Sequence, residues 1–280
     1  MAGEAIARRI LRNAYDQGVR RAVMNLHHRP ETITALVGDG SDLGIRVQYS
    51  FESPVLGSAG GPRKALPLLP DEDFFLINGD TLSNVDFGAL EARHRETGAL
   101  ATIAVVPNRW PQKYSGLILD SMGRFHSVAP RGSTVRSYHV IGIQIVHPSA
   151  FARLPLNEPA ESISGVYRNL VAENLGTVRA FLCESDFIDV GTAGDYLEAS
   201  SVIGQREERP LPHVGEGCDI DPTARLSDSI LWDRVRIGPR AVLHRCIVAD
   251  DVEVPAGAIH ENCVIIQREG TLEFSDLPHV

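Results

Sequence analysis

Two consecutive stretches near the C-terminus, Ser227–Leu243 (SDSILWDRVRIGPRAVL) and His244–His260 (HRCIVADDVEVPAGAIH), align at an offset of 17 residues. A period this short is typical of one coil of a solenoid, in which each coil buries its aliphatic side chains against the coils above and below. The matching pairs are Ile230/Ile247, Leu231/Val248, Asp233/Asp250, Val235/Val252, Ile237/Val254 and Ala241/Ala258.

The repeat continues in both directions from these stretches. Cys263–Ile265 follow Cys246–Val248 in step, and upstream Ile220 falls in register with Ile237. Within a coil, aliphatic residues recur six apart, as in Ile220 and Leu226, which suits three short strands per coil and a triangular cross-section. The pattern resembles the hexapeptide-repeat left-handed β-helix, which we expect over residues 214–270. A small β-sandwich is the alternative for the same aliphatic residues.

Residues 1–203 alternate between helical and strand-like patterns, which favours an α/β domain with a Rossmann-like, mostly parallel sheet and helices on both faces. The charged, proline-containing segment over 204–213 is predicted to be a linker. The expected helices cover Ala2–Gln17, a short segment opening at Pro30, a stretch ending at Leu69, Phe87–Arg95 and Ala193–Val202. The expected strands cover Arg21–Leu26, Gly44–Ser50, Phe74–Ile77, Leu100–Val106, Val178–Leu182 and Phe187–Gly191, with an antiparallel insertion formed by Gly116–Leu119, Arg124–Val128 and Tyr138–Val146.

Composition excludes several classes of function. The chain has 280 residues, of which 43% are hydrophobic and 22% charged, and its net charge is 27 − 36 = −9. A dedicated nucleic-acid binder would usually carry a basic surface, so we expect no nucleic-acid partner. No apolar run reaches the length of about 20 residues that a membrane span needs, and the N-terminus lacks a signal peptide, so we expect a cytoplasmic protein without a membrane partner. The four cysteines form no C-x-x-C pair, which argues against a zinc site or a disulfide framework.

Two aspartates each follow a short hydrophobic strand. Asp80 ends the run Leu76-Ile77-Asn78-Gly79-Asp80, and Asp189 lies in Phe187-Ile188-Asp189-Val190-Gly191. In open α/β sheets ligands bind beyond the carboxyl ends of the strands, and carboxylate oxygens suit Mg²⁺. The two residues therefore form a candidate Mg²⁺ site. The alternatives are an ordinary Asn-Gly-Asp turn at Asp80 and a helix cap at Asp189.

A glycine-rich stretch, Leu56-Gly57-Ser58-Ala59-Gly60-Gly61, precedes a helix that contains Arg63 and Lys64. Such a loop lets backbone N–H groups approach an anion or a base closely. A plain strand-to-helix connection is the alternative interpretation of these glycines.

Taken together and in this order, these stretches resemble the sugar-1-phosphate nucleotidyltransferases, and most closely those similar to mannose-1-phosphate guanylyltransferases with a hexapeptide tail. The resemblance implies transfer of a nucleotidyl group from a nucleoside triphosphate to a sugar-1-phosphate with release of pyrophosphate, with GTP and mannose-1-phosphate as the first choice. It implies that Asp80 and Asp189 hold Mg²⁺ as catalytic residues. The implied nucleotide-binding residues are Leu56, Gly57, Ser58, Ala59, Gly60, Asn78 and Gly79, and the implied sugar contacts are Gly116 and Gly142.

The chain departs from this family at two places. The family opens with a strand, a glycine-rich loop bearing an arginine and a later Lys-Pro pair, whereas Met1–Glu4 correspond to the segment just after them. We therefore expect little transferase activity from the chain as written, and we interpret its start as misplaced on a longer gene. An in-frame stop directly before Met1 would contradict this. The family's Glu-Lys-Pro is replaced by Val128-Ala129-Pro130-Arg131, where Arg131 is expected to contact the sugar phosphate or to be a solvated loop residue.

Two other functions fit parts of the sequence. A non-catalytic subunit that senses a nucleotide sugar would not need the triphosphate loop, although it would not need Asp80 and Asp189 either. A β-helix acyltransferase would use a histidine such as His244 or His260, but it needs a longer stack of coils. Packing against the catalytic domain or against a second copy of the chain is the other expected role of the β-helix. The choice of base and sugar stays open.

Overall fold

The computed structural model describes residues 1 and 3–277, so Ala2, where the first helix was expected to begin, lies outside the described residues. The chain divides into two compact units, one formed by Ala7–Phe187 and the other by Met1–Ile6 together with the chain from Ile188 onward. Within the described residues, no helix is both long and apolar enough to cross a membrane.

The first unit alternates helices and strands as the sequence predicts. Its helical elements are α1 (Ile6–Asp16), α2 (Pro30–Val37), η1 (Ser41–Leu43), α3 (Gly57–Ala65), η2 (Leu66–Leu68), α4 (Phe87–Thr97), α5 (Ser149–Ala152), the π-helical turn η3 (Ser162–Tyr167) and α6 (Arg168–Glu173). Its strands are β1 (Arg21–Leu26), β2 (Arg46–Phe51), β3 (Phe74–Ile77), β4 (Thr81–Ser83), β5 (Ala101–Pro107), β6 (Gly116–Leu119), β7 (Phe125–Ala129), β8 (Tyr138–Val146) and β9 (Val178–Leu182), with β10 (Phe187–Asp189) at its end.

The main sheet has the order β7-β6-β8-β5-β9, and β3 also pairs with β8. Strand β8 is antiparallel to β3, β5 and β6, whereas β5 and β9 are parallel. Strands β3, β5, β6 and β9 therefore all run in one direction and β8 runs against them. The α/β class and the antiparallel insertion are confirmed. The expected mostly parallel pairing is wrong for this sheet, because β8 lies in its middle and pairs antiparallel with β3, β5 and β6, so that among its described pairs only β5 and β9 are parallel.

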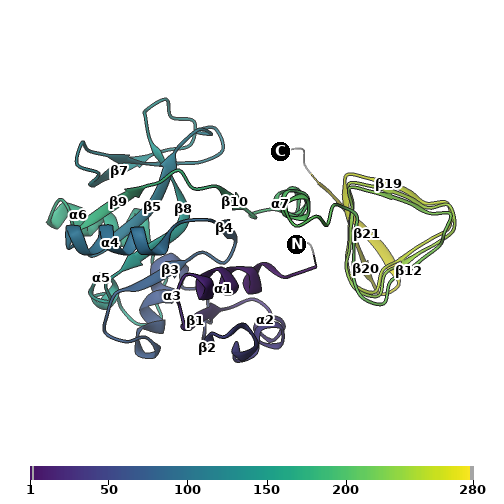
Figure 1. Cartoon of the computed structure of the whole chain (residues 1–280), viewed down its shortest axis with the longest axis horizontal. Coiled ribbons are helices and arrows are strands. Elements are labelled where there is room, and N and C mark those ends of the chain that lie inside the picture. The colour runs from purple at the N-terminus through teal and green to yellow at the C-terminus, as the bar shows by residue number, and fades with distance from the viewer. Residues whose placement is uncertain (2, 278–280) are drawn as a thin grey trace. The chain divides into compact units, whose positions relative to one another are not determined.

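Helices cover both faces of this sheet, as expected (Figure 1). On one face, Ile103 of β5 packs in a core with Phe151 of α5 and Tyr167 of η3. On the other face, the neighbouring Ala104 packs in a second core with Leu90 of α4. Because side chains alternate between the faces of a strand, one apolar strand supplies both cores.

Strand β3 differs from its expectation. A continuous apolar strand such as Phe74–Ile77 is typical of a sheet covered on both faces, but all four residues are only half-buried. Within the described part of the chain, β3 pairs only with β8. Strands β1 and β2 form a parallel two-stranded sheet of their own. As a strand paired along one edge, β3 leaves part of its surface uncovered.

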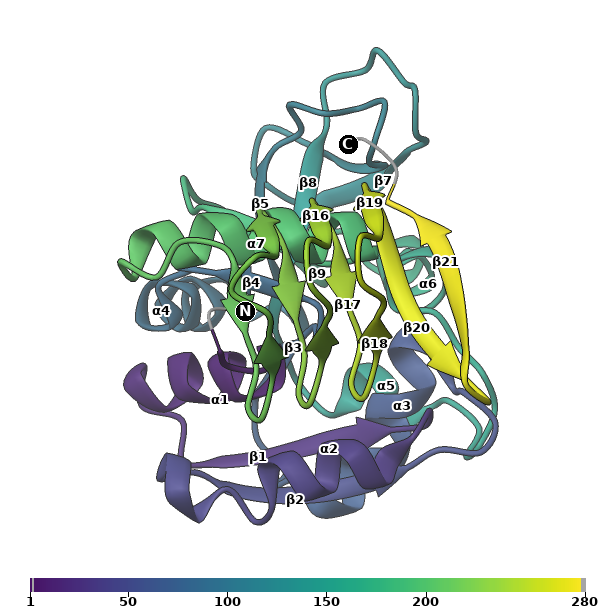
Figure 2. The same cartoon turned by 90° about the vertical axis from the view of Figure 1, so that its right-hand side faces the viewer.

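The second unit contains the predicted solenoid, seen end-on as a triangle in Figure 1 and from the side as stacked coils in Figure 2. Each coil contributes one strand to each of three sheets, and neighbouring coils pair at an offset of 17, as Ile230 with Ile247 and Ile237 with Val254. The first sheet contains β11 (His213–Val214), β14 (Ile230–Leu231), β17 (Ile247–Val248), β20 (Cys263–Arg268) and β21 (Thr271–Asp276). The second contains β12 (Asp219–Ile220), β15 (Arg236–Ile237) and β18 (Glu253–Val254), and the third contains β13 (Arg225–Ser227), β16 (Val242–His244) and β19 (Ile259–Glu261).

Left-handed backbone forms the corners of the coils and also recurs every 17 residues. At one corner the φ angles of Asp228, Arg245 and Asn262 are 47°, 51° and 52°. Polar side chains bridge the stacked turns, since Asp233 accepts from the N–H of Glu216 at 2.8 Å. These bonds satisfy backbone donors that the short strands leave unpaired. The corners keep successive coils in register.

Helix α7 (Ala193–Arg206) packs on the first sheet of the solenoid. Its buried Leu197 contacts a cluster that includes Ile230 and Ile247, and Glu198 forms an ion pair with Arg245 at 3.0 Å. The helix therefore belongs with the β-helix in packing, although we placed it in the first domain, 1–203. The linker expected over 204–213 begins inside this helix, and regular structure extends beyond the expected end at residue 270 to β21.

Candidate functional site

The turn that carries Asp80 is hydrogen-bonded to the adjoining strand β8 and packs closely against it. The N–H of Asn78 donates to the carbonyl of Gly142 at 2.7 Å. Gly142 has a φ of 73°, and a Cβ there would lie 3.0 Å from Cβ of Asn78 and 3.1 Å from Cβ of Thr81. Only glycine fits this approach. The structure therefore brings the expected residues Asn78, Asp80 and Gly142 together at the end of β3.

The Asp80 carboxylate is exposed, and it accepts a hydrogen bond from the Thr81 hydroxyl at 3.3 Å. Gly79, beside it, has open space where a side chain would be, because no heavy atom lies within 4 Å of an ideal Cβ. A ligand could thus approach the backbone of this turn closely.

Asp189 is the last residue of β10, a strand that begins in the first unit with Phe187 and continues into the second, and it is half-buried. It does not cap the following helix, because Thr192 occupies the N-cap and accepts from the N–H of Asp195 at 3.1 Å. A Cβ on Gly191 would lie 4.0 Å from Oδ2 of Asp189 and 3.8 Å from Oδ2 of Asp195. Two carboxylates therefore approach Gly191 at the start of α7, and sequence reasoning identified only one of them.

The glycine-rich stretch is helical instead of forming a loop. Helix α3 begins at Gly57, and the N–H groups of Ala59 and Gly60 donate to the carbonyl of Ala160 at 2.9 and 3.3 Å. The Ser58 hydroxyl donates to Glu161 at 2.8 Å. We expected N–H groups of this stretch to reach a ligand, but two of them are already used within the protein.

Close packing explains why glycines occur there. A Cβ on Gly60 would lie 2.6 Å from the Glu158 carbonyl oxygen, and one on Gly61 would lie 2.5 Å from Oε1 of Glu52. Leu56, at the start of the stretch, is fully buried. The cations that follow are also engaged, since Arg63 donates to the Leu154 carbonyl at 2.9 Å. The stretch is a packing motif that fixes the start of α3.

Glu52 is a buried carboxylate that sequence reasoning missed. It is 7% exposed and joins three elements. One oxygen accepts from the side-chain amide of Asn25 at 2.9 Å, and the other accepts from the N–H of Leu56 at 2.8 Å. Part of the signal that singled out Asp80, an acid close after the end of a strand, also applies to Glu52, which directly follows β2.

Four ring side chains from three separate segments gather near Gly116, an expected sugar contact; we call them the aromatic cluster (Trp110, Tyr114, His139 and Phe187). The His139 ring lies 4.1 Å from the Tyr114 ring and 4.9 Å from the Phe187 ring, between centroids. Trp110 meets Phe187 edge-on at 6.1 Å and is half-exposed. Sequence reasoning missed this cluster, because its members are dispersed over 78 residues and carry no local pattern.

Gly116 adjoins the aromatic cluster. A Cβ on Gly116 would lie 2.5 Å from Oγ of Ser137, and Leu117 pairs with Tyr138 in the sheet. Of the two glycines expected to contact the sugar, Gly116 lies on β6 beside Ser137, just before β8, and Gly142 lies within β8. His139 is placed on β8 between Ser137 and Gly142.

Burial lowers the pKa of His139 to about 4, and the nearby positive charge of Lys113 acts in the same direction. A hydrogen bond with the backbone of Ser115 opposes this shift. His139 is consequently neutral at physiological pH.

Arg131 lies exposed on the loop after β7. The next residue, Gly132, donates its N–H to the carbonyl of Pro111 at 2.7 Å, which ties this loop to the segment that carries Trp110. Residues 108–139 contain five basic residues and one acid, Asp120, in a chain with a net charge of −9. The surroundings of the aromatic cluster are thus suited to an anionic ligand.

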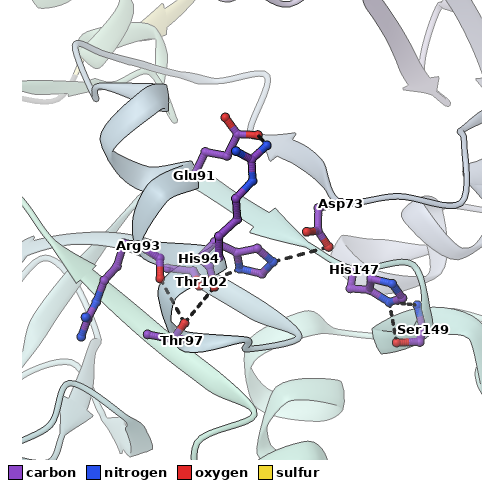
Figure 3. A network of polar contacts seen from close by, with 9 residues as sticks. Asp73, Glu91, Arg93, His94, Thr97, Thr102, His147 and Ser149 are labelled. Atoms are coloured by element: carbon purple, nitrogen blue, oxygen red, sulfur yellow. Dashed lines mark hydrogen bonds and ion pairs between the residues drawn. The ribbon is translucent and has the colours of Figure 1, made fainter.

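A second polar network, shown in Figure 3, is structural. His94 of α4 contacts the Thr102 hydroxyl at 2.8 Å and Asp73 at 3.5 Å, in the order hydroxyl, imidazole and carboxylate. Thr102 is fully buried and His94 is 3% exposed, so no substrate reaches the hydroxyl. The network fastens α4 to β5.

The histidines of the β-helix are also engaged within the protein. His244 Nδ1 lies 2.9 Å from the Ser227 hydroxyl, and His260 stacks on Phe274 at 4.8 Å. His260 pairs with Leu243 in the sheet, so the two histidines do not lie side by side in register.

Comparison with known proteins identifies the family. The family model described as "Nucleotidyl transferase" matches residues 1–206. The chain belongs to this family. A second model, described as "GlmU-like, C-terminal hexapeptide", matches residues 207–261, in agreement with the solenoid. The predicted family membership is thereby confirmed, and the chain is a nucleotidyltransferase with a hexapeptide β-helix.

Relatives of this nucleotidyltransferase differ in the substrates that their names give. A UTP–glucose-1-phosphate uridylyltransferase of Synechocystis sp. is 25% identical over 268 residues, covering 89% of this chain and 69% of that protein. A mannose-1-phosphate guanylyltransferase of Mycobacterium tuberculosis is 25% identical over 255 residues, covering 87% of this chain and 71% of that protein.

Solved structures share the fold of the nucleotidyltransferase unit. HddC from Yersinia pseudotuberculosis, complexed with GMP-PN, superposes with a TM-score of 0.62 at 20% identity, covering 72% of this chain and 87% of that one. A putative glucose-1-phosphate thymidylyltransferase from Bacillus anthracis gives 0.62 at 13% identity, with 70% and 81% covered. At these identities the likeness concerns the fold alone.

Proposed function

We propose that this nucleotidyltransferase makes a nucleotide sugar from a nucleoside triphosphate and a sugar-1-phosphate, with GTP and mannose-1-phosphate as first-choice substrates. The observation that carries the proposal is the Asn78–Asp80 turn, which presents an exposed carboxylate and is held against Gly142. The similarity to enzymes named for mannose-1-phosphate and glucose-1-phosphate supports this substrate class.

The proposed reaction needs alignment and charge neutralisation more than a protein nucleophile. An oxygen of the sugar phosphate attacks the α-phosphorus of the triphosphate, the bond to the β-phosphate breaks, and pyrophosphate leaves. Within the described residues, no cluster of three or more histidines, cysteines, aspartates or glutamates is arranged to hold a metal. Mg²⁺ fits that finding, because it is usually bound by one or two carboxylates together with substrate phosphates. We propose Asp80 and Asp189 as those carboxylates.

When bound, Mg²⁺ would supply positive charge to the phosphates. The chain's own residues would bind and position the two substrates. On the nucleotide side, Leu56–Gly60 would shape the base pocket by packing, while Asn78 and the open backbone at Gly79 would adjoin the phosphates. On the sugar side, Gly116 and Gly142 would leave room for the sugar, and Arg131 would contact its phosphate.

A substrate panel tests the proposal. Mannose-1-phosphate and glucose-1-phosphate are each combined with GTP, UTP, dTTP and ATP in the presence of Mg²⁺, and pyrophosphate release is measured. Even where the absolute rate is low, we expect one substrate pair to release pyrophosphate faster than the others. Absence of release from every pair, together with tight binding of a nucleotide sugar by calorimetry, would instead support a sensing subunit.

The carboxylates are tested by substitution. Asp80→Asn and Asp189→Asn should each lower pyrophosphate release at least a hundredfold, because each removes a negative ligand from a site built on charge. Asp71→Asn is the matched control, since Asp71 is an exposed acid near the start of β3. Full activity of Asp80→Asn would contradict the proposed role of this turn.

A further inference from the structure

His139 lies at a distance from the Asp80 turn that suits a sugar phosphate. It precedes Gly142 by three residues on β8, and a strand advances about 3.3 Å per residue, so the two positions are separated by about 10 Å. Gly142 in turn contacts the Asn78–Asp80 turn. A ligand with its phosphate near this turn could therefore reach the aromatic cluster with its other end.

The chemistry of His139 is unusual for a residue that serves only to fill space. Its imidazole contacts both the Tyr114 and the Phe187 rings, and burial there disfavours its charged form. In a neutral imidazole one nitrogen donates and the other accepts. Because the ring also hydrogen-bonds to the backbone of Ser115, one nitrogen is used within the protein. Because His139 is only half-buried, its second nitrogen can bond to a ligand.

Trp110 gives the aromatic cluster an open side. It is 51% exposed, although a large apolar ring gains free energy by burial. Half-exposed aromatic rings beside a hydrogen-bonding group can pack against the C–H face of a pyranose while polar groups bind its hydroxyls. The excess of basic residues over 108–139 adds attraction for a ligand that carries a phosphate.

We propose that the aromatic cluster is the sugar-recognising part of the site, with His139 accepting a hydrogen bond from a hydroxyl of the pyranose ring and Trp110 packing against that ring. This inference rests on the proposed function, since it concerns the sugar-1-phosphate of the same reaction. His139 then acts as a specificity-determining residue, and Trp110 reports on occupancy.

The two tryptophans of the chain, Trp110 and Trp232, allow a direct binding test. Trp232→Phe leaves Trp110 as the single tryptophan of the full chain. Titration of this variant with mannose-1-phosphate or glucose-1-phosphate should change its fluorescence saturably. Inorganic phosphate, which carries the charge without the sugar, should leave the fluorescence unchanged. Sugar-phosphate binding seen by calorimetry without any fluorescence response would overturn the proposal.

The role of His139 is isolated by two substitutions in this background. His139→Phe keeps a ring in the cluster but removes the acceptor, and we expect sugar-phosphate affinity to fall about tenfold, the effect of losing one hydrogen bond. His139→Gln restores an acceptor and should recover most of that affinity. His126→Phe, at an exposed position on β7, is the matched control and should bind as the parent does.

A role of His139 in packing alone predicts different sugar-phosphate affinities for these variants. If His139 only fills space, His139→Phe binds sugar phosphate as well as the parent, and the inference is wrong. Absence of any sugar-phosphate binding would also overturn it. The proposed function fails separately, when no substrate pair releases pyrophosphate even though Trp110 responds to sugar phosphate.

Discussion

The imidazole of His139 links ligand recognition to the pH dependence of stability. Burial holds its pKa at about 4 in the folded chain, against about 6.5 when unfolded, and the charge of Lys113 contributes in the same direction. Between about pH 4 and pH 6.5 the unfolded chain binds a proton at this residue, whereas the folded chain does not. This contribution to stability is therefore fully present above pH 6.5 and is lost as the pH falls towards 4.

Urea unfolding at several pH values between 7 and 4.5 measures this effect. The midpoint of the unit that contains His139 should fall with pH in the parent and fall less in His139→Phe, which has no group to protonate. Other groups titrate in the same window, so the difference between the two proteins is the relevant quantity. Identical pH profiles would show that the imidazole is not held neutral by its surroundings.

Individual site residues differed in how far the sequence revealed them. Asp80 could be predicted because a strand followed by a glycine turn is a local pattern, whereas Gly142 was expected only from the family resemblance; the structure places the two residues together. His139 could not, since its role depends on Tyr114 and Phe187, which are distant in the sequence. Glu52 carried a usable signal, a strand-end acid, but its burial becomes visible only when β1, β2 and α3 are brought together.

At the level of elements, the start of α3 depends on Glu52. Glu52→Gln keeps the size of the side chain but puts an amide N–H₂ where two donors, from Asn25 and Leu56, already point inward. An unsatisfied buried donor costs about 1–3 kcal/mol, so we expect the free energy of unfolding to fall by that amount. Glu158→Gln, at an exposed acid beside the same helix, should change it by less than about 0.5 kcal/mol. Chemical denaturation of both variants measures these two changes in the free energy of unfolding.

The glycine-rich stretch and the solenoid show why some elements are easier to predict than others. Glycine has low helix propensity, so Gly57–Gly61 suggest a loop, but contacts with Ala160 and Glu161 hold them in a helix. Each solenoid coil contacts only the coils next to it, so the same residue types recur every 17 residues. The pairing register could therefore be predicted residue by residue.

For the whole molecule, the two compact units predict two unfolding transitions. Each has its own buried core, with Ile103 fully buried in the first and Val254 fully buried in the second. Val254→Ala should lower the free energy of unfolding of the solenoid unit by about 2 kcal/mol. Ile103→Ala should lower that of the first unit by about 3 kcal/mol. Calorimetry of both variants tests this. A single transition that moves equally in both would show that the units unfold together.

Domain boundaries were the least predictable feature at this scale. Helix α7 follows the α/β pattern in the sequence, and the family model also extends to residue 206. Its packing partner is nevertheless the solenoid, through Leu197 and Glu198. A sequence pattern records which face of a helix is apolar, but it does not record which neighbour covers that face.

The last strand of the solenoid decides how its length could change. Strand β21 runs antiparallel to β20 and carries Glu273 and Asp276, so it interrupts the parallel ladder and presents charge at the free margin. A further coil could not continue the parallel pairing of this sheet from β20, because β21 already occupies that edge. Lengthening would require insertion ahead of β20 in whole multiples of 17 residues, because one residue more or fewer would turn the buried aliphatic side chains outward.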